Sequence, residues 1–350
     1  MIVVGYGMDY VQNVSDVLGA SDIGLYLRPD MDVAIKPNLV VPGPASNGAT
    51  THPEVVEGII LFLREFGVAK IKIIESSWVG DSTKRAFRDC GYEELSRRLD
   101  VPLIDLKSDG HSTLAHNGYE IHICDEALNS DFLINVPVLK AHCQTSLTCC
   151  MKNLKGCIPD SEKRRFHTLG IHEPVAVLNA LLRCGYNVVD GICGDLTFEE
   201  GGNPVVSNRI LAGRCPVLLD SYCAELIGYR PEEIGYLAHA AKLQIGEFYS
   251  DATPIIIQNA DAKPLNNPAA APPRFTSRIK EDAACSACYS ALVYALQRHK
   301  TPPANLYIGQ GFINKTGDGI GIGNCCAAFA NHIPGCPPRA ANIVEYLASH

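Results

Sequence analysis

The cysteines near the C-terminal end constrain the fold most, because cysteines that share a metal centre must be brought together. Fifteen of the 350 residues are cysteines. Cys285 and Cys288 form a Cys-x-x-Cys pair, Cys325 and Cys326 are adjacent, and Cys336 lies in a Gly-Cys-Pro-Pro sequence. A Cys-x-x-Cys pair presents two thiolates to one centre, and two further loop cysteines complete the set that an iron–sulfur cluster needs. We predict a 4Fe–4S cluster bound by Cys285, Cys288, Cys336 and Cys325, with Cys326 as the alternative to Cys325.

Other uses of these cysteines are open at this point. Zinc accepts the same four thiolates, and the cysteines could also form disulfides or stay buried as inert thiols. A zinc ribbon carries two Cys-x-x-Cys pairs, whereas this stretch carries one. The sequence Gly335-Cys336-Pro337-Pro338 is similar to the cluster loop in small subunits of hydrogenases and quinone oxidoreductases. Glycines at positions 317, 319, 321 and 323 would let the backbone approach a cluster closely.

Charge and the N-terminal sequence exclude several classes of protein. The net charge is −8 and the pI is near 5.8, which argues against the basic face of a nucleic-acid-binding protein. The first residues lack the basic and apolar regions of a signal peptide, and no apolar run approaches the ~18 residues of a membrane span. An odd number of cysteines without an export signal favours a reducing compartment. We therefore expect a cytoplasmic protein, from a host that lives with little oxygen, and we leave homo-oligomerisation open.

Strands and helices alternate along the first three quarters of the chain. Residues 32–36 and 68–75 read as buried strands that flank a helix with apolar residues at helical spacing. Such a β-α-β unit indicates a parallel sheet. Thr51 is expected to cap that helix, and Asp220 a later one. Further strands are expected at residues 101–106, 132–136, 186–190, 205–212, 217–219 and 254–259. The predicted fold class is α/β, with an open, mostly parallel sheet and flanking helices, plus a small C-terminal α/β iron–sulfur module.

The composition changes after Lys263. Residues 264–273 are rich in proline, asparagine and alanine, which is typical of a linker. We expect an α/β domain at residues 1–263, a linker at 264–278 and the iron–sulfur module at 279–350. Within the module, residues 279–299 are expected to be helical.

A second group of residues suits an anionic ligand. Basic and amide side chains follow predicted strands of an otherwise acidic chain, at Lys36, Asn38, Lys140, His142, Lys152, Asn153 and Lys155. Open α/β sheets bind ligands at strand ends, and such side chains suit a carboxylate or a phosphate. His142 is the best candidate for proton transfer, because histidine titrates near neutral pH. Lys140 and Asp190 are further catalytic candidates.

Plainer roles for these residues are also open. The lysines could be solvated at a strand or helix end, and Asp190 could make an Asx turn. Glu199 and Glu200 are expected in a flexible acidic loop. A second metal centre is conceivable at Cys143, Cys149, Cys150 and Cys157, although their spacing fits no named pattern.

The first ~260 residues resemble the domain of unknown function 362 family. The resemblance rests on several motifs in order: Lys36-Pro37-Asn38-Leu39, Pro53-Glu54-Val55-Val56, residues 135–142, residues 151–156, Asp190-Gly191 and Gly201-Gly202. It implies the α/β fold and an association with an iron–sulfur module, commonly of ferredoxin type. The cysteine pattern of this chain differs from the ferredoxin pattern. The resemblance implies no specific activity.

These observations favour an iron–sulfur redox enzyme that acts on an anionic small substrate or cofactor. One alternative is an electron-transfer or redox-sensing protein that works with a redox protein partner. Another is a lyase or dehydratase, in which a cluster iron acts as a Lewis acid and His142 moves protons. That alternative needs an iron without a thiolate ligand.

Overall fold

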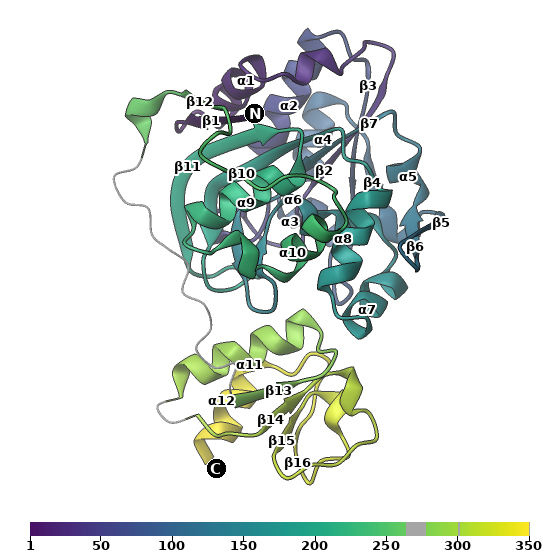
Figure 1. Ribbon diagram of the computed structural model, residues 1–350, viewed down its shortest axis with the longest axis vertical. Coiled ribbons are helices and arrows are strands. Elements are labelled where there is room, and N and C mark those ends of the chain that lie inside the picture. The colour runs from purple at the N-terminus through teal and green to yellow at the C-terminus, as the bar shows by residue number, and fades with distance from the viewer. Residues whose placement is uncertain (264–277, 300–301, 350) are drawn as a thin grey trace. The chain divides into compact units, whose positions relative to one another are not determined.

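The computed structural model describes residues 1–263, 278–299 and 302–349. Contacts divide the chain into two units, Met1–Lys163 with His172–Ala270 and Arg164–Ile171 with Ala271–His350. The first unit contains an eight-stranded sheet and the second a four-stranded sheet (Figure 1). The segment predicted as a linker lies outside the described residues, apart from Arg278.

The large sheet is mostly parallel, as predicted. Its strand order is β12-β1-β11-β10-β7-β2-β3-β4. Within this sheet β11 runs antiparallel to both neighbours, and the other neighbouring pairs are parallel. The strands are β1 Ile2–Tyr6, β2 Asp32–Pro37, β3 Lys70–Glu75, β4 Leu103–Asp105, β7 Phe132–Val136, β10 Tyr186–Asp195, β11 Pro204–Gly213 and β12 Ile255–Gln258.

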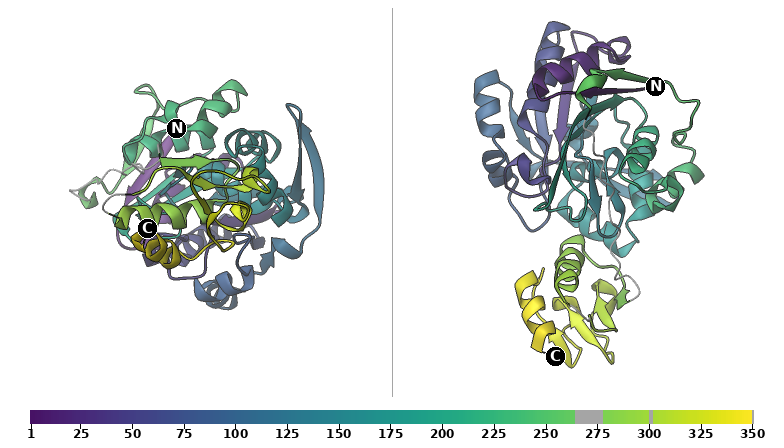
Figure 2. Two further views of the ribbon diagram at one scale, coloured as in Figure 1. Left: turned by 90° about the horizontal axis from the view of Figure 1, so that it is seen from below. Right: turned by 90° about the vertical axis from the view of Figure 1, so that its left-hand side faces the viewer.

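Helices cover both faces of this sheet (Figure 2). One face carries α1 Tyr10–Gly19, α2 Pro53–Glu65, α3 Thr83–Asp89 and α4 Tyr92–Leu99. The other carries α6 Cys150–Asn153, α8 His172–Leu181, α9 Pro216–Leu226 and α10 Gly235–Lys242. The apolar positions that predicted α2 are fully buried: Val55, Val56, Ile59, Ile60 and Leu63. Each such side chain contributes about 1.5–3 kcal/mol through burial, which holds α2 on the sheet.

Shorter elements complete the first unit. They are the antiparallel hairpins β5 His111–His116 with β6 Tyr119–Cys124 and β8 Lys140–His142 with β9 Ser146–Thr148, and the helix α5 Asp125–Leu128. The helix α7, Asp160–Thr168, has its first four residues in this unit and the others in the second. Asn117 and Gly118 both have positive φ in the turn between β5 and β6, as an Asn-Gly hairpin turn requires.

Two of the expected caps were wrong. The helix α2 begins after His52 with Pro53 in its first turn. The Thr51 hydroxyl instead donates to Val136 O and accepts from Asn38 N, both at 2.8 Å. Asp220 lies inside α9, where it cannot cap its own helix. Its carboxylate accepts hydrogen bonds from Cys150 N and Met151 N at the start of α6.

Other differences concern element type and length. Residues 217–219 belong to α9, although they were expected to form a strand. A short apolar run does not distinguish a buried strand from a buried helix. The strand that begins at Tyr186 continues to Asp195 instead of ending at an Asp190-Gly191 turn. The strand β1 was not predicted.

The second unit is a small α/β arrangement. Its strands are parallel and adjacent in sequence order: β13 Ile279–Glu281, β14 Leu306–Ile308, β15 Ile320–Ile322 and β16 Asn331–Ile333. The helix α11, Ser286–Arg298, packs against α12, Ala340–Ser349. Residues 279–281 form β13, so the predicted helix begins later than expected. Because the strands are parallel, their carboxyl ends lie at one edge of the sheet.

Among the helices that the structure describes, none is both long enough and apolar enough to cross a membrane.

Candidate metal centre and buried polar site

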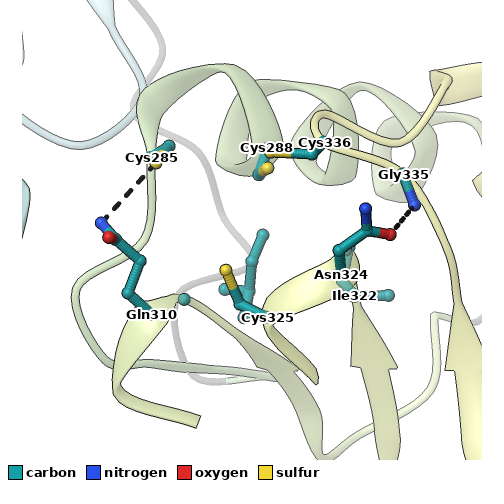
Figure 3. A pocket seen from close by; sticks show the side chains of 11 residues that line it. Cys285, Cys288, Gln310, Ile322, Asn324, Cys325, Gly335 and Cys336 are labelled. Carbon is teal, nitrogen blue, oxygen red and sulfur yellow. Dashed lines mark hydrogen bonds between the residues drawn. The ribbon is translucent and has the colours of Figure 1, made fainter. Parts of the chain in front are cut away.

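Four of the five C-terminal cysteines line one pocket at the carboxyl ends of the small sheet (Figure 3). Cys285 directly precedes α11 and Cys288 lies in its first turn. Cys325 follows β15, and Cys336 follows β16. The pocket contains about 300 Å³ of space, part of it open to solvent. Parallel strand ends and one helix start therefore bring together cysteines from three separate loops.

The structure separates the two adjacent cysteines that the sequence left as alternatives. Cys325 lines the pocket. Cys326 is fully buried, and its thiol donates a hydrogen bond of 3.4 Å to Tyr307 O. Both cysteines lie in the short helical turn Asn324–Cys326, in which successive side chains point in different directions. One sulfur therefore lines the pocket and the other packs on the small sheet.

Strand-end glycines shape the wall of this pocket. Gly309, Gly323 and Gly335 line it and have φ of 125°, 83° and 136°, values that residues with a Cβ rarely adopt. Asn324 N donates to Gly335 O at 2.9 Å, and Gly335 N donates to the Asn324 side chain at 2.7 Å. These bonds tie the two cysteine loops together. Of the glycines predicted to approach a cluster, Gly323 alone lies among the described lining residues.

The thiols of this pocket influence one another. Burial raises the pKa of Cys288 to about 12, with further contributions from the neighbouring Cys285, Cys336 and Cys325. Burial and then Cys336 also raise the pKa of Cys325. A bound cation inverts such shifts, because it stabilises the thiolate form. The donor set therefore suits a metal centre that keeps the cysteines deprotonated.

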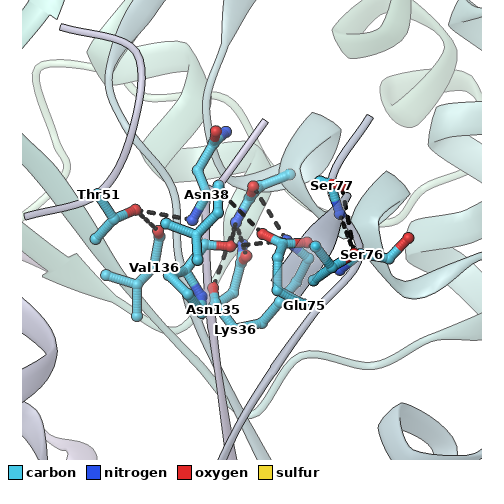
Figure 4. A network of polar contacts seen from close by, with 12 residues as sticks. Lys36, Asn38, Thr51, Glu75, Ser76, Ser77, Asn135 and Val136 are labelled. Atoms are coloured by element: carbon cyan, nitrogen blue, oxygen red, sulfur yellow. Dashed lines mark hydrogen bonds and ion pairs between the residues drawn. The ribbon is translucent and has the colours of Figure 1, made fainter. Parts of the chain in front are cut away.

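In the first unit, Lys36 lies in a buried polar network (Figure 4). Its Nζ atom is 2.9 Å from Glu75 Oε2, 2.8 Å from Pro37 O and 3.3 Å from Asn153 Oδ1. Asn153 also donates to Asn135 Oδ1 at 2.8 Å. The structure thus brings Lys36 and Asn153 together, as the candidate site required. It also adds Glu75, which neutralises the lysine and which the sequence analysis did not single out.

Asn38 follows β2 and is also buried. Its backbone N–H donates to the Thr51 hydroxyl, while its side-chain oxygen has no hydrogen-bond partner among the described residues. Lys155 lies half-buried in the short helical turn Leu154–Cys157 and has interactions of its own.

A second buried cluster joins Lys140, His142 and Lys152 through Glu199. His142 Nε2 and Lys152 Nζ lie 2.5 Å and 3.2 Å from Glu199 Oε2. Lys140 Nζ donates to Ala49 O at 2.6 Å and to Glu199 O at 2.7 Å. Burial lowers the pKa of Lys140 to about 8. Three predicted residues therefore meet at Glu199, with His142 and Lys152 at its carboxylate and Lys140 at its backbone oxygen.

The hydrogen bonds of His142 determine which ring nitrogen carries the proton. Its Nδ1 atom accepts from the backbone N–H groups of Gln144 and Thr145, at 3.1 and 3.2 Å. The ring proton therefore lies on Nε2, close to Glu199 although not well aligned with it. Burial lowers the pKa of His142 to about 4, so the ring is neutral near pH 7. In this state His142 can donate a proton at Nε2 but cannot accept one there.

Glu199 is a second site residue, after Glu75, that the sequence analysis did not assign to the site. Burial acts to raise its pKa, but His142, Lys152 and Lys140 outweigh burial and hold it well below its usual range. The expected flexible loop has defined contacts, because Asp195 accepts from Thr197 N, Phe198 N and Asn203 N. In the sequence, Asp195 directly before this loop is the residue that could have indicated an ordered loop.

Asp190 is buried and bonds to His52. Its Oδ2 atom accepts from both the backbone N and the ring Nδ1 of His52, each at 2.8 Å. Its Oδ1 atom accepts from Ile192 N, two residues along the chain. Burial acts to lower the pKa of His52, but the Asp190 carboxylate outweighs it and raises the pKa overall.

Fold and site together define an α/β protein with a cysteine-lined pocket in a second, smaller unit. The chain belongs to the family described as domain of unknown function (DUF362), whose model matches residues 33–225. This match confirms the family resemblance. The C-terminal cysteines lie outside the matched residues.

One curated relative is the thylakoid-associated protein sll1697 of Synechocystis sp. It is 30% identical over 145 residues, which are 41% of this chain and 44% of that protein. The chain thus matches less than half of the relative's length.

Two solved structures are distantly similar. The lactate racemase apoprotein from Thermoanaerobacterium thermosaccharolyticum is 11% identical, with a TM-score of 0.45 over 93% of this chain and 69% of that one. A protein from Thermotoga maritima is also 11% identical, with a TM-score of 0.36 over 53% of this chain and 51% of that one. Similarity at this level says nothing of function.

Proposed function

We propose that this chain is an iron–sulfur redox protein whose second unit binds one 4Fe–4S cluster through Cys285, Cys288, Cys325 and Cys336. The observation that carries the proposal is the single pocket lined by these four cysteines at one sheet edge. When bound, a cluster of this kind supplies one-electron transfer at a potential that its surroundings set. A complete set of four thiolates favours this use over Lewis-acid chemistry, which needs an iron without a thiolate.

The spread of the four sulfur atoms supports a cluster over a single zinc ion. Zinc–sulfur bonds of about 2.3 Å place the sulfurs of a tetrahedral site about 3.8 Å apart. In this described pocket no three cysteine sulfurs lie within 4.8 Å of one another. Each thiolate of a 4Fe–4S cluster binds a different iron, so its sulfurs are farther apart than those around one ion.

Neighbouring groups would favour the thiolate form and adjust the potential. Cys285 and Cys288 lie at the N-terminus of the 13-residue helix α11, where the helix dipole stabilises negative charge. The Gln310 side-chain amide lies 3.8 Å from Cys285 Sγ and can donate to it. Donors to ligand sulfur raise the reduction potential of such centres.

Serine variants of the adjacent cysteines test the proposed ligand set. Cys325→Ser is expected to lose most of the visible absorbance and iron of anaerobically purified protein. Cys326→Ser is the matched control, because its thiol bonds to Tyr307 O and does not line the pocket. It should keep its iron. Retention of iron by Cys325→Ser together with its loss from Cys326→Ser would reverse the assignment.

For the substrate, we propose an anionic small molecule that exchanges with the Glu199 carboxylate. Lys152 and His142 Nε2–H already hold a carboxylate there, so their arrangement suits another one or a phosphate. Lys36 is paired with Glu75, and Lys140 donates to backbone oxygens. These two lysines would support the fold of the site, while Lys152 and His142 would contact the ligand.

Anion binding by a Glu199 variant tests this exchange. Glu199→Gln removes the competing charge, so inorganic phosphate or oxalate should bind more tightly. The loss of one charge-assisted contact, about 1.5 kcal/mol, corresponds to roughly a tenfold lower Kd. Glu200→Gln serves as the control and should bind as the wild type does. Equal affinity of all three proteins in calorimetric titrations would argue against Glu199 as the exchanging group.

An electron carrier without chemistry of its own is the second candidate. It is favoured by the protein acceptors that Lys36, Lys140 and Lys152 already have. For an enzyme, His142→Ala and Lys152→Ala should abolish turnover and leave the reduction potential nearly unchanged. A carrier would keep full activity with its redox partner in both variants.

A further inference from the structure

We propose that the first unit holds a separate structural zinc ion, bound by Cys149, Cys150 and Asp220 with Cys223 as the fourth ligand. These residues come from the start of α6 and from one face of α9. Within the described residues, Cys149, Cys150 and Asp220 are the group whose ligand atoms lie within 4.8 Å of one another. The site belongs to a different unit from the C-terminal cysteine pocket.

The sulfur positions suit a single ion. Cys149 Sγ and Cys150 Sγ are 3.8 Å apart, and the edge of a tetrahedron with zinc–sulfur bonds of ~2.3 Å is about 3.8 Å. Cys223 follows Asp220 by three residues on α9, so both project from one face of the helix. Cys223 lies outside the group within 4.8 Å, so its side chain would move toward the pair when the ion binds.

The Asp220 carboxylate lies beside the thiols of Cys149 and Cys150 and is held in place by other donors. Its Oδ1 atom accepts from Cys150 N at 2.7 Å. Its Oδ2 atom accepts from Met151 N at 3.1 Å and from the Tyr236 hydroxyl at 3.2 Å. An ionised carboxylate offers about four acceptor positions. These bonds occupy three, and the neighbouring thiols of Cys149 and Cys150 interact with what remains until a metal replaces their protons. The three bonds also fix the orientation of the carboxylate, as the outer partners of metal ligands do.

Burial and donor type decide the kind of ion. All four side chains are fully buried. Three thiolates and one carboxylate suit zinc better than magnesium or calcium, which prefer oxygen donors. A site with four protein ligands and no open position is structural. The ion would join α6 to α9, and α6 carries both Lys152 and Asn153, so it would hold the two buried polar networks in place.

Metal analysis of the full chain tests the proposal without interference from the C-terminal pocket. In a parent variant with Cys285, Cys288, Cys325 and Cys336 all changed to Ser, expression with added zinc should yield about one zinc per chain. Cys150→Ala and Cys223→Ser in this parent should reduce the zinc to background. Cys157→Ser is the matched control, because Cys157 is equally buried but lies outside the group. It should retain the zinc.

Cobalt gives a second measurement that does not depend on folding of the variants. The same parent, produced with Co²⁺, should show the intense visible absorption of tetrahedral cobalt–thiolate coordination. A natively folded parent without bound zinc or cobalt would overturn the proposal. Zinc that persists in both Cys150→Ala and Cys223→Ser would overturn it too, as would a disulfide among these cysteines in place of the metal. None of these results bears on the C-terminal cluster, whose ligands the parent lacks.

Discussion

Two buried carboxylates form ion pairs with buried lysines. Glu75 lies beside Lys36, and both side chains are at most 3% exposed. Glu199 lies beside Lys152, at 9% exposure each. A buried ion pair contributes little compared with an apolar pair, but removal of one partner leaves an uncompensated charge. The residues of the polar site are therefore sensitive to single substitutions and tolerant of paired ones.

Glu75→Gln should lower the free energy of unfolding by about 3–5 kcal/mol, because Lys36 then keeps a buried charge without its partner. Urea unfolding of the first unit, followed by circular dichroism, measures this loss. The double variant Lys36→Met/Glu75→Gln should recover part of it. A double variant as unstable as Glu75→Gln alone would contradict this account of the pair.

His52 should stabilise the fold most at low pH. Its pKa is raised in the folded protein because Asp190 outweighs the effect of burial. The stabilisation is complete below the ordinary histidine pKa of about 6.5 and is lost as the pH rises through the raised value. The difference in unfolding free energy between wild type and His52→Asn should therefore shrink from pH 5.5 to pH 8.5. A difference that grows with pH would contradict the assignment.

His142 should show the opposite dependence. Burial lowers its pKa to about 4 in the folded protein, whereas the unfolded chain takes up this proton near pH 6.5. The folded state therefore loses stability as the pH falls from about 6.5 to 4, with no further loss below that window. His142→Gln should remove this part of the acid sensitivity. Unfolding free energies measured across the window would contradict the account if both proteins lost stability in parallel.

At the scale of elements, Asp195 organises the loop that carries Glu199. Its carboxylate accepts from backbone N–H groups at both ends of residues 197–203. Asp195→Ala leaves these donors and the buried Phe198 N–H without this partner, and the buried donor alone costs about 1–3 kcal/mol. Hydrogen exchange of the amides of residues 197–203 should accelerate, while β10 and β11 stay protected. Unchanged exchange in the loop would show that other contacts hold Glu199.

The regular elements of the large sheet follow from local sequence patterns. The β2-α2-β3 unit has strands rich in Val and Ile and a helix with buried residues at helical spacing, so adjacent residues are sufficient to predict it. The contact of Glu75 with Lys36 could also have been predicted, since β2 and β3 are parallel neighbours. The strand β1 could not be placed in the sheet in this way, because its partners β11 and β12 lie about 200 residues or more along the chain.

The polar site could be predicted only in part. Lys140, His142 and Lys152 lie within 13 residues of one another, and basic residues so close in sequence indicate a site. Glu199 joins them from a loop 47 residues beyond Lys152, and no spacing rule connects the two. The role of Asp220 could not be predicted for the same reason. Its contacts to Cys150 and Met151 join α9 to α6 across about 70 residues.

At the scale of the whole molecule, the chain combines a family domain with a separate cysteine-bearing unit. The family match ends at residue 225, and the pocket cysteines begin at Cys285. The redox proposal therefore depends on the second unit, whereas the anion proposal depends on the first. Loss of the cluster in Cys336→Ser should leave the unfolding of the first unit nearly unchanged.

Iron and sulfide analysis of anaerobically purified wild-type protein, combined with EPR after reduction, tests the central claim most directly. The account predicts about four iron and four sulfide ions per chain and an EPR signal of a reduced 4Fe–4S cluster. Cys336→Ser should lose both. A colourless wild-type protein with zinc in its C-terminal cysteine pocket and no acid-labile sulfide would contradict it.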